Sequence, residues 1–166
     1  LLHLLQHAVP DLPSYWARCK KTALLRAWMA GEPVAAIETA FTVNPFFRVA
    51  SGDITGLADT TRFHLRAAHR IATVVLPAAS EEDGRLEQLL TQLEIGLPAD
   101  ALPLLKLPVP LLRGEYLRLR EAKLATADDV LLQTGDQLTA LLGKTRANQL
   151  AAYLAVDPHK AAVPAS

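Results

Sequence analysis

The chain has 166 residues, of which 51% are hydrophobic, 5% aromatic and 20% charged. This length and apolar content allow one compact domain or two small ones, each with a real core, and they argue against disorder. Lysine plus arginine and aspartate plus glutamate each number 17, so the formal net charge is zero. A chain whose whole surface binds nucleic acid normally carries a basic excess, so such binding here would need a local basic strip.

Leucine and alanine dominate, which favours helices over sheets. The single Cys19 excludes a disulfide framework within the chain and is compatible with a reducing compartment. The scattered histidines and the lack of a cysteine pair predict no metal site of the structural zinc type. No apolar run reaches the ~18 residues of a membrane span. Because residue 1 is not methionine, we interpret the chain as a fragment of a longer protein, or as one whose start was removed.

The first part of the chain predicts three helices divided by proline and glycine. Residues 1–7 are apolar on one side, and residues 14–31 form a longer helix that Gly31 is placed to end. A short helix follows Pro33, which suits a first helical turn.

The segment that follows, up to residue 53, predicts a loop around an Asn-Pro pair. It carries Phe46 and Phe47, which either pack on the core or stand exposed for binding. We expect packing, because exposed large apolar groups are the less common outcome.

The longest predicted helix covers residues 52–76, more than six turns and about 35 Å. Asp53 can cap its start, and Pro77 cannot continue it. At about 100° per residue, one arc collects the residues that we expect to pack on other helices: Ile54, Leu57, Ala58, Thr61, Leu65, Ala68, Ala72 and Val75.

On the opposite side of this helix we place a cationic stripe with an aromatic ring at its edge. Cations meet phosphates and a flat ring stacks on a base, so this pairing is typical of single-stranded nucleic acid binding. A solvated polar face with Phe63 packed on a neighbouring helix is the more common meaning of such spacing. The candidate residues are Arg62, Phe63, Arg66, His69 and Arg70.

A domain boundary is predicted where five prolines and glycines fall between residues 96 and 110, after a linker at 78–84 and a helix at 85–93. We therefore predict a helical bundle over residues 1–97 and a second domain over 98–157. The tail, 158–166, is rich in alanine and proline and is expected to fray.

The second domain predicts four short helices, and the fold class is all-α because no strand-like alternation of useful length occurs. Thr126 to Asp129 begins one helix with a capping-box pattern. Between the last two helices lies Gly143, followed by Lys144 and Arg146. This segment is either an ordinary helix–helix turn or a hairpin whose backbone N–H groups face a phosphate. The predicted helices span 113–122, 126–133, 135–142 and 145–154.

No spacing of residues predicts a catalytic site. Gly143-Lys144-Thr145 lacks the second glycine and the strand of a phosphate-binding loop. Residues 81–83 are acidic and indicate a solvated linker rather than a metal site.

Five stretches, however, occur in the order seen in one family. They are LLHLLQHAVPDLPSYW, KKTALLRAWMAGEPVAAIE, GDITGLADTTRFHLRAAHRIA, LEIGLPADALPLLKLP and LATADDVLLQTGDQLTALLGKTRANQLAAYL. Together they resemble the C-terminal third of superfamily II DNA helicases of the archaeal repair, Ski-like type. The motor motifs of that family are missing from this chain.

The resemblance implies a "ratchet" helical bundle followed by a helix-hairpin-helix domain, in which an aromatic of the long helix stacks on a base of the translocating strand. Phe63 occupies that position in this chain. A second DNA contact of the family is an arginine, and Gly56 occupies its position here. The first hairpin lacks the usual glycines at 109–112, whereas the second keeps Gly143. The DNA-binding set that we predict is Phe63, Arg62, Arg66, Arg70, His69, Gly143, Lys144 and Arg146.

The resemblance further implies a non-catalytic region whose partners are single-stranded DNA and the motor domains of the same parent chain. ATP and magnesium would be bound by those motor domains, so no cofactor is expected in this fragment. We expect a monomer without membrane contact, located in the cytoplasm of a prokaryote at the nucleoid. The alternative is a protein-interaction module that kept the helical scaffold and lost its DNA role.

Overall fold

The computed structural model describes residues 11–44, 46, 48–76 and 81–156, and within these ranges the regular elements are all helical. The all-α prediction is confirmed. The helix predicted at 1–7 and the tail at 158–166 lie outside the described residues. The chain separates into two compact units, Leu1–Gly96 and Leu97–Ser166.

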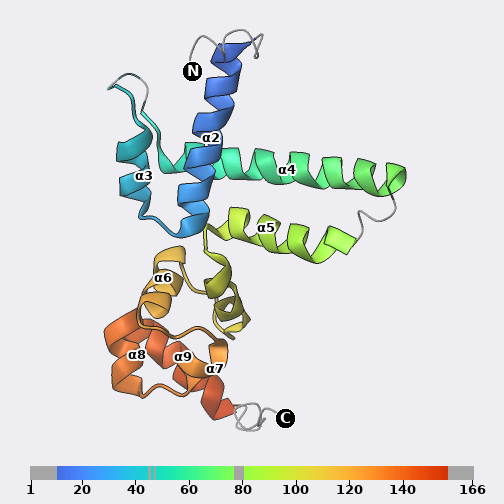
Figure 1. Ribbon diagram of the computed structural model, residues 1–166. Helices are drawn as coiled ribbons and strands as arrows, with labels where there is room; N and C mark the ends of the chain where they lie inside the picture. Colours follow the sequence, from blue (N-terminus) through green and yellow to red (C-terminus); the bar gives the residue numbers. More distant parts are fainter. Residues whose placement is uncertain (1–10, 45, 47, 77–80, 157–166) are drawn as a thin grey trace. The chain divides into compact units, whose positions relative to one another are not determined.

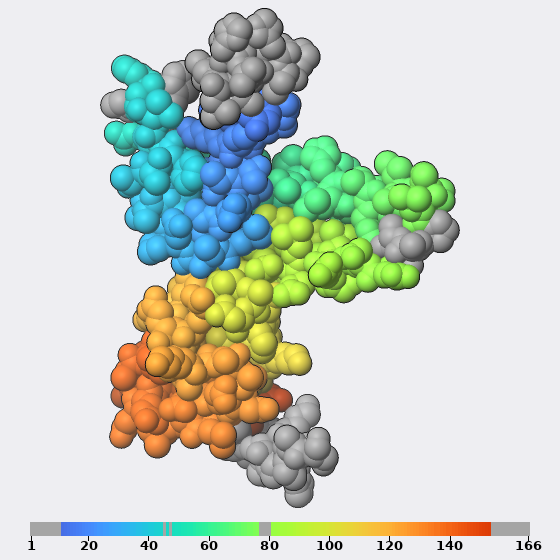
Figure 2. Space-filling model, in the orientation of Figure 1, coloured from blue at the N-terminus to red at the C-terminus, as the bar shows by residue number. Residues whose placement is uncertain are grey.

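The first unit contains α2 (Leu12–Ala30), α3 (Val34–Phe41), α4 (Ser51–Val75) and α5 (Asp83–Ile95). Figure 1 shows α4 and α5 side by side, with α2 crossing one end of the pair. The space-filling view in Figure 2 shows α4 and α5 in contact with each other. The core of this unit therefore lies where α2, α3, α4 and α5 converge, and its fully buried side chains include Ile37, Ile54, Leu90 and Leu93.

Local sequence signals set the ends of these helices. Gly31 has the left-handed φ of 87° and ends α2, as predicted. Asp53 does assist the start of α4, although from its third position: its carboxylate accepts the backbone N–H of Ala50 at 2.9 Å. Trp28 anchors α2 to α5 by donating its indole N–H to the backbone oxygen of Leu93 at 2.8 Å.

The second unit contains a 3₁₀ helix η2 (Ala99–Lys106) and the α-helices α6 (Arg113–Glu121), α7 (Ala127–Leu131), α8 (Gly135–Leu142) and α9 (Lys144–Val156). The proline-rich segment is therefore not only a connector, because η2 buries Ala101 and Leu104 in the core of this unit. A 3₁₀ helix tolerates Pro103 in a short run, where an α-helix would lose a hydrogen bond and clash.

The capping box predicted at residue 126 is present at the start of α7. The Thr126 hydroxyl accepts the Asp129 N–H at 3.1 Å, and the Asp129 carboxylate accepts the Thr126 N–H at 2.9 Å. These hydrogen bonds hold the pKa of Asp129 below its usual value.

Candidate nucleic-acid interface

The solvent side of α4 carries an aromatic ring next to two cations. Phe63 is 69% exposed, and its ring meets that of His64 edge to face at 5.5 Å. Arg66 and Arg70 are exposed, and neither makes an ion pair or side-chain hydrogen bond with a described residue. Residues spaced by three and seven positions share one side of a helix, so Phe63, Arg66 and Arg70 form one stripe. We call this stripe the Phe63 face.

Arg62 does not belong to the Phe63 face, and its predicted place opposite the core is wrong. Its side chain is only 15% exposed, and it forms ion pairs with Asp59 at 3.0 Å and with Glu94 of α5. Arg62 lies about 80° around the helix from Ile54 and about 90° from the centre of the apolar arc, so it flanks the interface with α5. Arg62 therefore links two helices and is not available to a phosphate.

The predicted place of His69 opposite the core is wrong for the same reason. It lies about 70° from the centre of the apolar arc, its side chain is 20% exposed, and its Nε2 contacts the carboxylate of Asp83 on α5. The acidic residues 81–83 thus do more than solvate a linker, because Asp83 holds the far ends of α4 and α5 together.

The apolar arc itself is buried only along the first half of α4. Ile54 and Ala58 are fully buried, but Ala68 and Val75, both predicted to pack, are exposed. The end of the helix also exposes other large apolar side chains, at 64–83%: Ile71, Val74 and Leu76. α4 therefore extends beyond the core of its unit.

Phe46 is 91% exposed, so the prediction that it packs on the core is wrong. Its backbone N–H is held by the side chain of Asn44 at 2.9 Å, which fixes a tight turn and leaves the ring in solvent. Phe47 lies outside the described residues.

In the second unit, only Gly143 and Lys144 remain available to a phosphate among the three residues predicted for the hairpin. Gly143 joins α8 to α9 with a φ of 83°, which a side chain would strain, and Lys144 is exposed. Arg146 instead contacts the buried Glu115 at 3.4 Å and the Gln149 side chain at 2.9 Å. The Arg146 guanidinium is thereby tied to the core of the unit.

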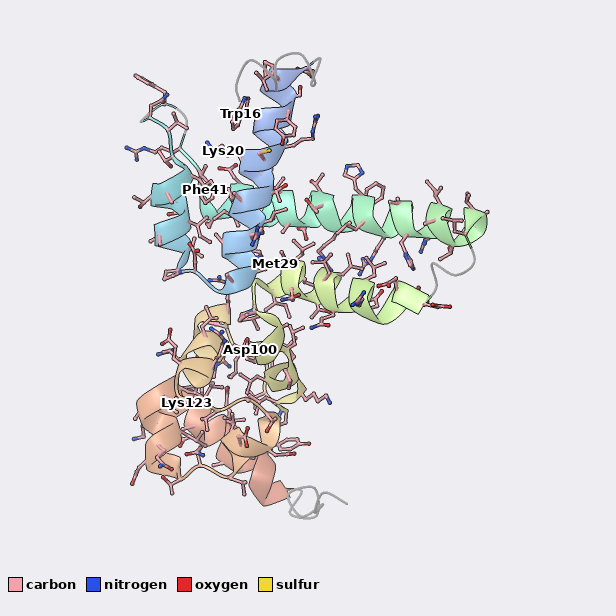
Figure 3. All side chains as sticks on the ribbon, in the orientation of Figure 1. Trp16, Lys20, Met29, Phe41, Asp100 and Lys123 are labelled. Atoms are coloured by element: carbon pink, nitrogen blue, oxygen red, sulfur yellow. The ribbon has the colours of Figure 1, made fainter. Side chains whose placement is uncertain are left out.

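A further basic element escaped the sequence prediction. α2 holds four cations and no acid, and it exposes Trp16. Figure 3 shows Trp16 and Lys20 along one part of α2, while Met29 lies at its other end beside α4 and α5. The excess of basic over acidic residues within this one helix is the sequence signal that would have revealed it, because the neutral total of the whole chain hides that excess.

Neither a metal centre nor a membrane span is found in the part of the chain that the structure describes. No group of three or more histidine, cysteine, aspartate or glutamate side chains is arranged there so that it could hold a metal ion. None of the described helices has both the length and the hydropathy to cross a bilayer.

Comparison with known proteins gives no relative: no protein-family model matches this chain, and no curated protein has a similar sequence.

Proposed function

We propose that this chain is the non-catalytic C-terminal part of an ATP-dependent DNA helicase, and that it contacts single-stranded DNA through the Phe63 face of α4. The observation that carries the proposal is an exposed aromatic ring flanked on one helical stripe by Arg66 and Arg70, neither of them paired with a described residue. An exposed ring with nearby cations is the arrangement that stacks a base and neutralises the adjoining phosphates.

The role of this face would be mechanical. One base stacks on Phe63, which is worth about 1–3 kcal/mol, while the guanidinium groups hold phosphates. Contacts of this strength form and release during stepwise movement of a strand. ATP hydrolysis would belong to motor domains of the same parent chain, and the resemblance described above supports this division of labour.

Fluorescence anisotropy with a labelled oligothymidine at low salt tests the proposal. We expect Phe63→Ala and Arg66→Ala each to weaken binding. Val75→Ala is the matched control, because Val75 is an equally exposed apolar residue on α4 and lies off the Phe63 face. Equal affinity of wild type, Phe63→Ala and Arg66→Ala would refute the stacking proposal.

A protein-interaction module is the second candidate, and the exposed apolar end of α4 favours it. Ile71, Val74, Val75 and Leu76 lie together in the last turns of the helix, and contiguous exposed apolar groups typically mark a contact surface. If this candidate is correct, Val74→Ser together with Ile71→Ser abolishes capture of a partner and leaves oligothymidine binding unchanged.

A further inference from the structure

α2 is strongly basic within a neutral chain. Four cations lie between Leu12 and Ala30 and no acidic residue does: Arg18, Lys20, Lys21 and Arg26. Because the whole chain has a formal charge of zero, the remaining residues together carry four more acidic than basic groups. The excess of basic over acidic groups therefore lies on this one helix, and a neutral chain that binds nucleic acid needs such a local basic strip.

Two of these cations share one side of α2 and border a shallow hollow. Arg18, Thr22 and Arg26 are spaced by four residues, so they form a stripe about 12 Å long. Together with Tyr15 and Cys19 they line a hollow of about 310 Å³. Thr22 and Arg26 also border the adjoining hollow, which includes Thr61 and Leu65 of α4. The two hollows therefore meet at Thr22 and Arg26, and the second, whose walls are mostly apolar, reaches α4 on the side of its apolar arc.

The charges of the stripe are largely uncompensated. Arg18 and Arg26 are exposed and form no ion pair with a described residue. Arg18 does interact with the carboxylate of Asp11, but the pKa of Asp11 is lowered mainly by hydrogen bonds from Ser14 and only to a smaller extent by Arg18. Asp11 is thus used in capping α2, and Arg26 lies four turns away from it.

Aromatic rings lie at the same end of α2. Tyr15 and Trp16 meet edge to face with centroids 6.2 Å apart, and Trp16 is about half exposed. Although much of the hollow's lining is apolar, its two exposed cations, the Thr22 hydroxyl and the exposed Trp16 ring beside it suit the phosphates and bases of a polynucleotide.

We propose that the Arg18–Thr22–Arg26 stripe of α2 is a second binding site for single-stranded nucleic acid, where the two guanidinium groups each hold a backbone phosphate. The site extends the proposed function, since it would hold the same strand that stacks on Phe63. Arginine suits this task because its planar fork donates two hydrogen bonds to one phosphate.

Salt dependence separates this site from the stacking site. Each phosphate contact on a single strand contributes about 0.7 to the slope of log affinity against log salt. Arg18→Ala/Arg26→Ala should lower the steepness by about 1.4, so wild type loses about sevenfold more affinity than the variant between 50 and 200 mM salt. Phe63→Ala should weaken binding at every salt concentration without changing the slope.

The matched control is Arg85→Ala/Arg118→Ala, which removes two exposed cations elsewhere. Arg18→Lys/Arg26→Lys keeps the charge and should keep most of the slope. An unchanged slope in the double alanine variant overturns the α2 site, even if Phe63→Ala still weakens binding and the proposed function stands. No oligothymidine binding by wild type would overturn both. Equal displacement of the oligonucleotide by polyglutamate at matched charge would also overturn the proposal, since the stripe would then attract any polyanion.

Cys19 provides an independent readout at the hollow itself, because it is the only cysteine and it is exposed. Bound oligothymidine should slow the alkylation of Cys19 by iodoacetamide in wild type, and less so in Arg18→Ala/Arg26→Ala at matched occupancy. Alkylation at an unchanged rate in the saturated wild-type complex would contradict the site.

Discussion

Arg62 and Arg66 are one turn apart on α4, yet the structure gives them different roles, and alanine variants should separate them. Arg62 is mostly buried and bridges Asp59 and Glu94, whereas Arg66 is exposed and pairs with no described residue. Arg62→Ala should therefore destabilise the first unit, and Arg66→Ala should affect ligand binding alone.

The loss of stability expected for Arg62→Ala depends on how far solvent reaches its ion pairs. A fully exposed ion pair is worth about 0–1 kcal/mol, and breaking a fully buried one costs about 3–5 kcal/mol. Arg62 is 15% exposed but its partners are 55% and 70% exposed, so solvent screens the pair from one side. We expect a loss of about 1–2 kcal/mol, part of it from packing of the aliphatic stem.

Urea unfolding followed by circular dichroism, with the double-mutant cycle Arg62→Ala/Glu94→Ala, measures this loss and the share due to the pair. Arg66→Ala should change the free energy of unfolding by less than about 0.5 kcal/mol while lowering the salt slope of oligothymidine binding by about 0.7. The reasoning is refuted if Arg62→Ala leaves stability intact and lowers the salt slope as much as Arg66→Ala does.

Three further predictions concern single positions. Gly56→Arg should raise stability by about 0.5–1 kcal/mol, because a side chain there meets nothing within 4 Å. It should also raise oligothymidine affinity, because residue 56 lies seven residues before Phe63 on the same stripe. A destabilised variant in thermal unfolding would contradict this prediction. Trp28→Phe should cost roughly 1–3 kcal/mol in urea unfolding, since it removes the hydrogen bond to Leu93; an unchanged midpoint would show that the bond contributes nothing. Asp129→Asn should lose less helicity than wild type when the pH is lowered. The pKa of the Asp129 carboxyl is lowered in the folded state, so the charged carboxylate stabilises the fold above its unfolded pKa of about 4, and this stabilisation is lost as the pH falls below that value. Identical acid titrations of wild type and Asp129→Asn, followed by circular dichroism, would contradict that sign.

Local rules predicted much of the fold, because many helix ends here depend on nearby residues. The end of α2 at Gly31 and the capping box at Thr126 need only short-range hydrogen bonds. The all-α class follows from periodicity and composition. Segment 99–106 was missed because proline argues against an α-helix but permits a short 3₁₀ helix.

The candidate site was predicted less well, because the availability of a side chain depends on its neighbours in space. Arg62, His69 and Arg146 are cations by sequence, but their partners Glu94, Asp83 and Glu115 come from other helices. The exposure of Phe46 depends likewise on a loop that no periodicity describes. Sequence gives the charges of this chain, and only packing shows which of them remain free for a ligand.

The most direct measurement is the affinity of the whole chain for oligothymidine with residue 63 varied. A stacked base contributes about 1–3 kcal/mol, so Phe63→Ala should raise the dissociation constant about 5- to 150-fold, while Phe63→Trp should keep or improve the affinity. Phe63 is exposed, so the stability of these variants should match that of wild type. Equal dissociation constants for wild type, Phe63→Ala and Phe63→Trp would contradict the account of α4 as a single-strand contact.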